Sequence, residues 1–335
     1  MTESETFKTA FETLVGSDLD CAISWLNQNQ TVAIPTETVY GLAGNGFEPD
    51  AIRRIYEAKR RPSYNPLILH TSSLARAKLF VTEIPDLAQK LADAFWPGPL
   101  TMLLPKSDLV PDAITSGLPN VAVRVPNHPV ALALLERLDF PLAAPSANPF
   151  GYISPTKSKH VYDQLKGRIP YVLEGGSCEA GIESTIVGFE DGVCIVHRLG
   201  ALEISEIEEV VGLVSLKNHS SEKPIGPGML KWHYSPRTPL QLGSLRELLK
   251  DALMQNPQLK IGALVFSEKL ENLSEDVQIV LSAERTLKEA GKNLYAALHA
   301  LDELGFDLIL AEKLPDTGLG RALNDRLERA SQRPF

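Results

Sequence analysis

The hydrophobic positions in the first two thirds of the chain form short apolar runs that alternate with segments of helical periodicity. Short runs that end in Pro or Gly predict strands, and apolar residues three or four positions apart predict amphipathic helices. The predicted strands are 31–34, 66–70, 100–105, 121–125, 141–144, 171–174, 184–189 and 193–198. The predicted helices are 18–29, 50–59, 84–95, 129–138 and 157–165. We therefore expect an α/β domain over residues 1–213, built as one strand-rich open sheet with flanking helices.

The pattern changes after this domain. Residues 214–242 are polar and rich in Gly and Pro, without a repeat of apolar positions, which is typical of a linker. Met229, Trp232 and Tyr234 are large apolar or aromatic residues within it, and we expect them to anchor a lid that closes over an active site. The alternative is a plain linker whose aromatic residues pack on the domain that follows.

Residues 243–335 predict a second, smaller domain. The runs IGALVF (261–266) and FDLILA (306–311) indicate buried strands, and apolar residues recur at helical spacing between positions 287 and 304. A strand, a helix, a second strand and a closing helix suggest a small parallel α/β, Rossmann-like domain.

Composition and charge narrow the class of protein. The 335 residues, 44% of them hydrophobic, are enough to bury one sizeable core and more readily two. No apolar run approaches 18 residues and the start, MTESETFK, is acidic, so we expect a cytoplasmic protein with no membrane segment. The net charge of -9 argues against tight nucleic-acid binding by this chain alone. Three cysteines without C-x-x-C spacing support neither a disulfide framework nor a zinc site.

Residues 31–70 hold the densest chemistry. An apolar run that ends at Pro35 is followed by hydroxyl side chains, by three glycines and then by Lys59, Arg60 and Arg61. Hydroxyls and the amides of a glycine turn donate to anionic oxygens, and Lys and Arg supply positive charge. The segment therefore predicts a pocket for a phosphorylated ligand. The alternative is a strand, a glycine turn and a solvated basic helix end.

Several motifs carry a resemblance to a known family. PTETVYGL (35–42), AKRRPSYNPLILH (58–70) and PLAAPSANPFGYISPT (141–156) resemble the YrdC-type domain of threonylcarbamoyl-AMP synthases. Further matches are GIESTIV (181–187), VHRLG (196–200) and GPGMLKWHYSP (226–236). The last motif is found in the long form of the family, in which a linker and a second domain follow the catalytic one. The resemblance is strong to residue 240 and weak beyond it.

The resemblance implies a fold, a reaction and its partners. The fold is a twisted mixed open sheet with a central positive cleft. The reaction converts ATP, L-threonine and bicarbonate into threonylcarbamoyl-AMP and diphosphate, the first step of N6-threonylcarbamoyladenosine formation in tRNA. Mg²⁺ is expected to accompany ATP, held largely by phosphate oxygens and water. Other proteins would then transfer the threonylcarbamoyl group to tRNA.

The resemblance also implies roles for single residues. Lys59 and Arg61 match the K-x-R signature and would be the catalytic cations. The residues that would contact L-threonine are Thr38, His70, Arg124, Ser146 and Ser184. Those that would contact ATP are Arg61, Asn65, Asn120, Asn148, Ser154, Arg198 and Tyr234. Asn120 departs from the threonine that the family more often carries there.

Elementary chemistry bears on several of these assignments. In-line attack on an α-phosphate gathers anions that repel one another, so the site needs cations and oriented donors more than a strong base. Arg124 is a charge inside an apolar strand and requires a partner, either the threonine carboxylate or a buried Asp or Glu. Ser146 and Asn148 follow a predicted strand, where ligands commonly bind, although PSANP is also an ordinary turn sequence. Glu183 is an acid inside the GIESTIV motif, and a structural role is enough to explain it.

Two other classes of function compete with this one. The basic residues Lys59 to Arg61 and nearby aromatics would suit an RNA-binding or ribosome-associated module, which would bind RNA in a salt-dependent manner without releasing diphosphate. A carbamoyl-transfer enzyme of the hydrogenase-maturation type shares the YrdC-type domain. It would also bring zinc-finger-like cysteine pairs and an acylphosphatase-like segment, and the sequence has neither.

Overall fold

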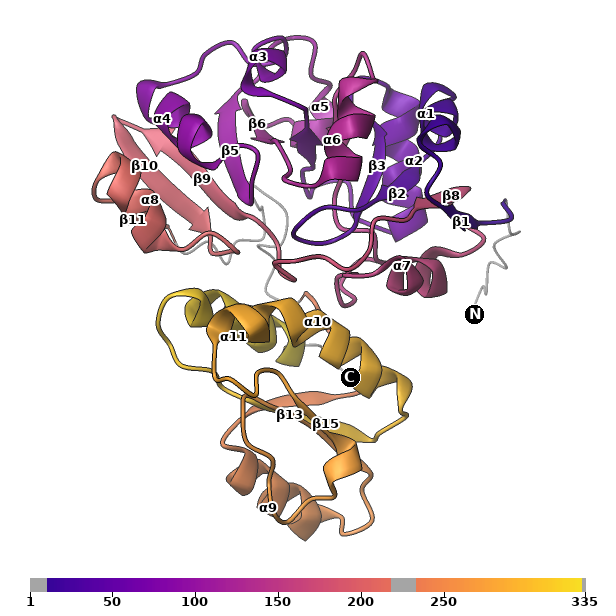
Figure 1. The fold of residues 1–335 in the computed structure, drawn as a ribbon, viewed down its shortest axis with the longest axis vertical. Coiled ribbons are helices and arrows are strands. Elements are labelled where there is room, and N and C mark those ends of the chain that lie inside the picture. The colour runs from indigo at the N-terminus through magenta and orange to yellow at the C-terminus, as the bar shows by residue number, and fades with distance from the viewer. Residues whose placement is uncertain (1–10, 218–232, 333–335) are drawn as a thin grey trace.

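The computed structural model describes residues 11–217 and 233–332, and these form two α/β domains (Figure 1). The predicted lid anchors Met229 and Trp232 lie outside the described residues. No helix in the described ranges is long and apolar enough to cross a membrane.

The larger domain is built on one sheet. Its strands are β1 (Leu14–Gly16), β2 (Val32–Ile34), β3 (Gly41–Asn45), β4 (Ile68–His70), β5 (Leu100–Pro105), β6 (Asn120–Arg124), β7 (Leu142–Ala143), β8 (Tyr171–Leu173), β9 (Thr185–Glu190), β10 (Val193–Arg198) and β11 (Ser215–Leu216). Its helices are α1 (Leu19–Asn27), α2 (Pro49–Lys59), α3 (Leu74–Ala77), α4 (Asp86–Phe95), α5 (Asp112–Thr115), α6 (Pro129–Glu136), α7 (Ser158–Leu165) and α8 (Ile204–Val211).

The strand order of the large sheet is β1-β8-β2-β3-β7-β4-β6-β5-β9-β10-β11 among the described residues. Neighbouring pairs are parallel in some places, such as β4 with β6, and antiparallel in others, such as β5 with β6. The predicted mixed open sheet is therefore confirmed. Every helix and strand predicted for this domain is present, with ends that differ by a few residues.

The glycine segment 41–46 corrects one expectation. It is not a turn with free amides but the buried strand β3, and the Leu42 amide donates to the Pro145 carbonyl at 2.7 Å. Glycine favours this close packing, since a Cβ on Gly44 would lie 3.2 Å from Cδ1 of Ile55 on α2, which is a tight contact. The amides of this strand therefore serve the sheet, and the helix that ends in the basic cluster lies close against it.

The smaller domain holds the strands β12 (Leu240–Gly243), β13 (Ile261–Val265), β14 (Gln278–Val280) and β15 (Leu308–Glu312). Its helices are α9 (Leu245–Gln255), α10 (Leu287–Glu303) and α11 (Leu319–Ser331), with a 3₁₀ turn η1 (Glu275–Val277). The strands are all parallel, in the order β12-β15-β13-β14. The predicted small parallel α/β domain is confirmed, although β12, β14 and α9 were not predicted. β12 begins at Leu240, inside the predicted linker.

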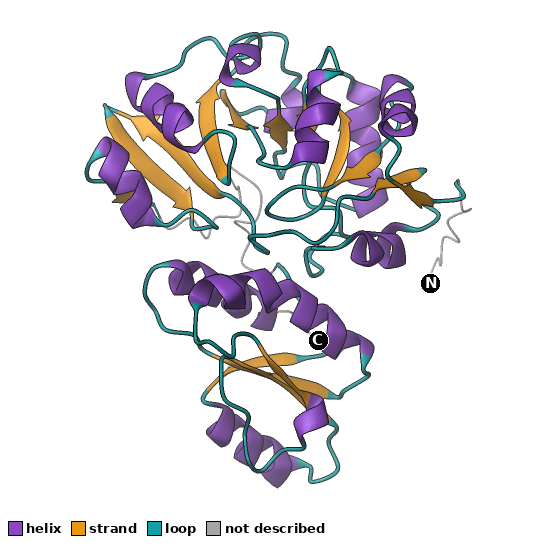
Figure 2. Cartoon of the chain, viewed as in Figure 1, coloured by secondary structure: helices purple, strands orange, loops and turns teal. Residues whose placement is uncertain are grey.

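Helices α10 and α11 form the layer of the smaller domain that faces the large one, and α9 covers the other face of the small sheet (Figures 1 and 2). One hydrophobic cluster crosses the boundary: Val39, Ile153 and Ile182 of the large domain pack with Leu294 of α10 and Leu323 of α11. The two domains therefore share a core at this boundary.

Candidate functional site

A cavity lies where several strand ends of the large sheet approach the smaller domain. It is lined by Thr36, Thr38, Val39, Gly41, Arg61, Ile68, His70, Arg124, Ala144, Pro145, Ser146, Glu183, Ser184, Arg198, His233 and Tyr234. The lining contains three guanidinium groups and one carboxylate, so its charge suits an anionic ligand.

Eight of the residues assigned from the sequence line this cavity together: Thr38, Arg61, His70, Arg124, Ser146, Ser184, Arg198 and Tyr234. Four others are buried beside the lining: Lys59, Asn65, Asn148 and Ser154. Asn120 is different, because it is exposed at the opposite end of β6 from Arg124 and outside the lining. Its assignment to ATP stays a prediction.

Lys59 ends α2 and is 1% exposed, so the alternative of a solvated helix end is wrong for this residue. Its Nζ donates to the backbone carbonyls of Ser146 and Asn148. Burial, followed by the nearby charge of Arg61, lowers the pKa of Lys59 well below its ordinary value. The ammonium group therefore fixes the loop that follows β7.

Arg61 follows a turn at Arg60, whose φ of 53° lies in the left-handed region. The guanidinium lines the cavity, while its Nε and Nη2 donate to the carbonyls of Asn65 and Pro66 at 3.2 and 2.9 Å. Burial lowers the pKa of Arg61 to about 10, so the group stays protonated at neutral pH. Arg61 therefore presents an oriented positive charge to the cavity.

Buried polar atoms around the cavity lack hydrogen-bond partners. Within the described residues these include the side-chain amide of Asn65, Oδ1 of Asn148, Nδ1 of His70, Nδ1 of His233 and the hydroxyl of Tyr234. An unmet buried donor or acceptor costs about 1 to 3 kcal/mol, which a polar ligand would offset. Burial and then the charge of Arg124 lower the pKa of His70 to about 3, so its imidazole is neutral at physiological pH.

Arg124 has the buried acidic partner that was the alternative to the substrate carboxylate. Its Nη2 lies 2.7 Å from Oε1 of Glu37, and both side chains are buried. Its Nη1 donates to Oγ1 of Thr38 at 2.8 Å and its Nε to the Gly98 carbonyl at 3.2 Å. Nε and Nη1 are therefore hydrogen-bonded, while Nη2 is ion-paired with Glu37, and together these contacts orient the guanidinium at the cavity.

The GIEST and VHRLG motifs meet at the other side of the cavity. Arg198 Nη2 donates to the Ser184 carbonyl at 2.7 Å, and the Ser184 hydroxyl lies 2.7 Å from that of Thr101. The two motifs approach closely at Gly200, where a Cβ would lie only 2.3 Å from the carbonyl carbon of Ser184.

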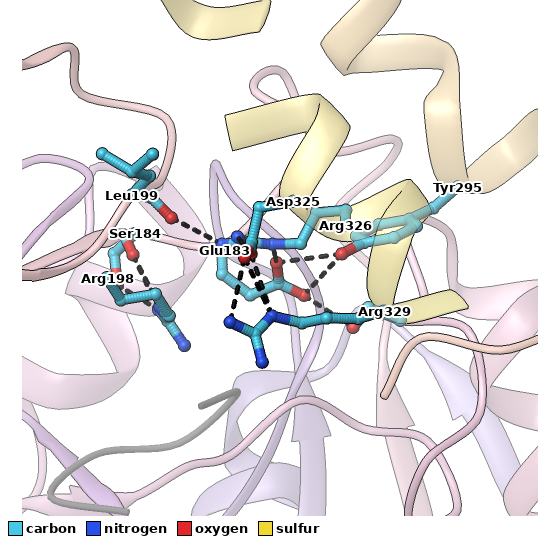
Figure 3. A network of polar contacts seen from close by, with 9 residues as sticks. Glu183, Ser184, Arg198, Leu199, Tyr295, Asp325, Arg326 and Arg329 are labelled. Atoms are coloured by element: carbon cyan, nitrogen blue, oxygen red, sulfur yellow. Dashed lines mark hydrogen bonds and ion pairs between the residues drawn. The ribbon is translucent and has the colours of Figure 1, made fainter. Parts of the chain in front are cut away.

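Glu183 has a larger part than the sequence indicated. Its carboxylate accepts hydrogen bonds from Ser154, from Tyr295 of α10 and from Arg326 of α11 (Figure 3). Tyr295 and Arg326 were not predicted, because the family resemblance is weak in that part of the chain. The usable signal was Arg326 itself, a charge on the apolar helix face that carries Leu323, Leu327 and Ala330.

Comparison with known proteins agrees with this architecture. A family model described as "Telomere recombination" matches residues 24–200, and one described as "Threonylcarbamoyl-AMP synthase, C-terminal domain" matches residues 202–332. The chain is 40% identical over 319 residues to a threonylcarbamoyl-AMP synthase of Bacillus subtilis, covering 92% of each chain. It belongs to the threonylcarbamoyl-AMP synthase family.

Other members of the family share both domains. A threonylcarbamoyl-AMP synthase of Pyrococcus abyssi is 39% identical over 322 residues, covering 92% of this chain and 93% of that one. The crystal structure of P. abyssi Sua5 complexed with L-threonine superposes with a TM-score of 0.88 at 36% identity, covering 95% of this chain and 97% of that one. YciO of E. coli shares the fold of the large domain, with a TM-score of 0.51 at 20% identity.

Proposed function

We propose that the protein is an L-threonylcarbamoyladenylate synthase. It converts ATP, L-threonine and bicarbonate into threonylcarbamoyl-AMP, diphosphate and water, the first step of N6-threonylcarbamoyladenosine formation in tRNA. The observation that carries the proposal is the cavity itself, where Arg61, Arg124 and Arg198 converge with neutral hydroxyl and amide groups. Family membership supplies the reaction that such a cavity would serve.

The cavity suits a step in which anions must be brought together. Threonine carbamate carries a nucleophilic oxygen that attacks the α-phosphorus of ATP, the bond to the bridging oxygen breaks and diphosphate leaves. Fixed guanidinium groups compensate the charge of both reactants and of the leaving group without reorganising. Arg61 and Arg198 would face the phosphates, and Lys59 would act indirectly by holding the loop of Ser146 and Asn148.

Arg124 is the proposed receptor for the threonine carboxylate. Its Nη2 is ion-paired with Glu37 but makes no hydrogen bond in the described parts of the chain, so it can donate to a carboxylate. Thr38, His70, Ser146 and Ser184 line the same cavity and would contact the rest of threonine. The ATP contacts would come from Arg61, Asn65, Asn148, Ser154, Arg198 and Tyr234, with Asn120 more distant.

The residues present fit a magnesium ion that enters with ATP. Among the described residues, the only carboxylate in the cavity lining is Glu183, which is already paired with Arg326. In the described ranges no group of three or more His, Cys, Asp or Glu residues could hold a metal ion. Mg²⁺ would therefore be coordinated by phosphate oxygens and water and would neutralise part of the phosphate charge.

The deciding experiment incubates the purified protein with ATP, Mg²⁺, bicarbonate and L-threonine and follows diphosphate together with the mass of the adenylate. We expect release that stops when threonine or bicarbonate is omitted. Release that ignores the omission of threonine would refute the function. Salt-dependent RNA binding without release would instead favour the RNA-binding module.

The product of this reaction is a mixed anhydride, which hydrolyses readily in water. We therefore propose that separate proteins take up the intermediate and transfer its threonylcarbamoyl group to adenosine in tRNA. The proposed location is the cytoplasm, and cell fractionation tests it.

A further inference from the structure

Glu183 supplies the single carboxylate in the described cavity lining, and side chains of the smaller domain donate hydrogen bonds to it (Figure 3). Tyr295 of α10 donates its hydroxyl to both oxygens of Glu183, at 3.1 and 3.0 Å. Arg326 of α11 donates from Nε to Oε2 of Glu183 at 2.9 Å. From within the large domain, the Ser154 hydroxyl donates to the same carboxylate at 2.7 Å.

Arg326 reaches a second backbone segment of the cavity wall. Its Nη2 donates to the carbonyl of Leu199 at 2.7 Å. One guanidinium therefore grips Glu183 and Leu199, and these are the direct neighbours of Ser184 and Arg198 in the chain. Since Arg198 is itself bonded to the Ser184 carbonyl, Arg326 fixes both ends of that contact.

The same two side chains support Tyr234. Its ring stacks on that of Tyr295, with centroids 5.8 Å apart, and the Arg326 guanidinium carbon lies 5.2 Å from the Tyr234 centroid. Tyr234 is 1% exposed and lines the cavity. Arg326 and Tyr295 themselves are absent from the lining, so they act on the cavity through residues that they touch.

The backbones of the two domains also lie close together two residues before Glu183. Gly181 has a φ of +75°, and a Cβ there would lie 2.4 Å from the carbonyl oxygen of Gly291 on α10. Burial raises the pKa of Glu183, but the charges of Arg326 and Arg198 together with the hydrogen bonds from Ser154 and Arg326 lower it overall, so the carboxylate is ionised at neutral pH. A buried ionised group depends strongly on its partners.

We propose that Arg326 and Tyr295 are positioning residues, through which the C-terminal domain sets the geometry of Arg198 and Tyr234 on the nucleotide side of the cavity. The inference rests on the proposed function. The threonine side is expected to depend less on these residues, because the Ser184 hydroxyl contacts Thr101 of the large domain at 2.7 Å as well as Arg198 at 3.2 Å.

The test measures steady-state kinetics of diphosphate release by the full chain carrying Arg326→Met, Tyr295→Phe or Glu183→Gln. Tyr295→Phe removes one hydroxyl and keeps the ring stack. The matched control is Tyr152→Phe, which removes another hydrogen bond between the domains, Tyr152 to Asp302 at 2.6 Å, without touching Glu183. Thermal unfolding is recorded for each variant.

We expect kcat/KM for ATP to fall about tenfold or more in Arg326→Met and about threefold in Tyr295→Phe, with KM for threonine changed less than about twofold. Tyr152→Phe should stay within about twofold of wild type in every parameter. In the double variant Arg326→Met/Glu183→Gln, kcat/KM for ATP should be no lower than in the less active of the two single variants, because both substitutions remove the same contact.

Equal behaviour of Tyr295→Phe and Tyr152→Phe would overturn the inference. So would a uniform fall in kcat with both KM values unchanged, since a smaller folded fraction produces that pattern. If Arg326→Met does not fold, Tyr295→Phe and Glu183→Gln carry the same comparison. A wild-type protein that releases no diphosphate would defeat the proposed function instead, and the two failures are therefore distinct.

Discussion

The two walls of the cavity are held in different ways. On one wall, Lys59 at the end of α2 bonds to two backbone carbonyls of the loop after β7, all within the large domain. On the other wall, Glu183 is held by Tyr295 and Arg326, side chains of the smaller domain. The contacts of the first wall stay within the large domain, whereas the second requires side chains of the smaller domain.

The two walls also differ in how their buried charges are balanced. Lys59 contacts neutral carbonyls, so burial dominates and its pKa falls. Arg326 lies against Glu183 and Asp325, and its pKa is raised although burial alone would lower it. In the described parts of the chain, the amino group of Lys59 is therefore bonded to backbone carbonyls without an acidic partner, whereas Glu183 and Arg326 form a paired network. Substitutions on the two walls should have separable effects.

The largest effect is expected for Arg61→Lys on the Lys59 wall. The ammonium of lysine cannot replace a planar guanidinium that is anchored by two carbonyls and faces phosphate. We expect kcat/KM for ATP to fall about a hundredfold, or about 3 kcal/mol of transition-state stabilisation, with the protein still folded. Kinetics of diphosphate release and thermal unfolding check both parts. A folded variant with wild-type turnover would show that the Arg61 guanidinium does not contribute to the reaction.

Lys59→Met tests the same wall through its scaffold. The substitution leaves the Ser146 and Asn148 carbonyls buried without their shared donor. The free energy of unfolding should fall by about 3 kcal/mol in urea titration, and activity should fall because the loop loses its support. The exposed Lys250→Met serves as a control and should change neither quantity.

Combining the two walls sharpens the comparison. Lys59 and Arg326 share no hydrogen-bond partner in the described parts of the chain. The losses in free energy of unfolding caused by Lys59→Met and Arg326→Met should therefore add, within about 0.5 kcal/mol, in the double variant. Marked non-additivity would show that the walls form one unit.

The same difference between the walls explains what the sequence could and could not predict. The apolar runs and the Pro and Gly residues at their ends fixed most elements of the large domain, and the K-x-R motif marked the helix end that faces the loop. The charge of Lys59 alone could not tell whether it faces a ligand or a carbonyl, because both are oxygen acceptors. Strand β3 was missed, since glycine usually marks turns and here permits close packing of α2.

On the Glu183 wall the limits are of another kind. Glu183 stands inside a motif, but its partners Tyr295 and Arg326 are far away in sequence, and no local pattern pairs them. Helix α9 did carry a usable signal, since Leu245, Leu249 and Ala252 recur at helical spacing. Helices and strands could thus be predicted from local sequence patterns, whereas the contacts between the domains could be identified only from the three-dimensional structure.

Arg124 offers a smaller test between the walls. Arg124→Ala should weaken threonine binding by about 2 kcal/mol and ATP binding much less, as measured by calorimetry with each ligand, because only the carboxylate loses a charged partner. Glu37→Gln keeps the shape but removes the charge that now balances Arg124, so it should strengthen binding of the threonine carboxylate severalfold. Equal losses for both ligands in Arg124→Ala would indicate that the Arg124–Glu37 pair is only structural.

The smallest expected effect is a pH dependence of stability that comes from buried histidines in both domains. Burial lowers the pKa of His70, at the cavity, to about 3 and that of His299, on α10, to about 4. Their ordinary pKa is about 6.5, so as the pH falls below that value the unfolded chain takes up protons that the folded chain does not. The stabilisation is complete above pH 6.5 and is lost as the pH falls toward the folded pKa values.

Between pH 7 and pH 5.5, each of these histidines should remove about 1 kcal/mol from the free energy of unfolding, measured by urea titration at each pH. His299 contacts the Ser154 carbonyl at 3.1 Å, and the amide of a glutamine can donate to the same oxygen. His299→Gln should therefore leave stability at pH 7 nearly unchanged while reducing the loss at pH 5.5 by about 1 kcal/mol. An identical pH slope in His299→Gln and wild type would show that this histidine is protonated equally in the folded and unfolded chain, and that the contact between the domains does not respond to pH through it.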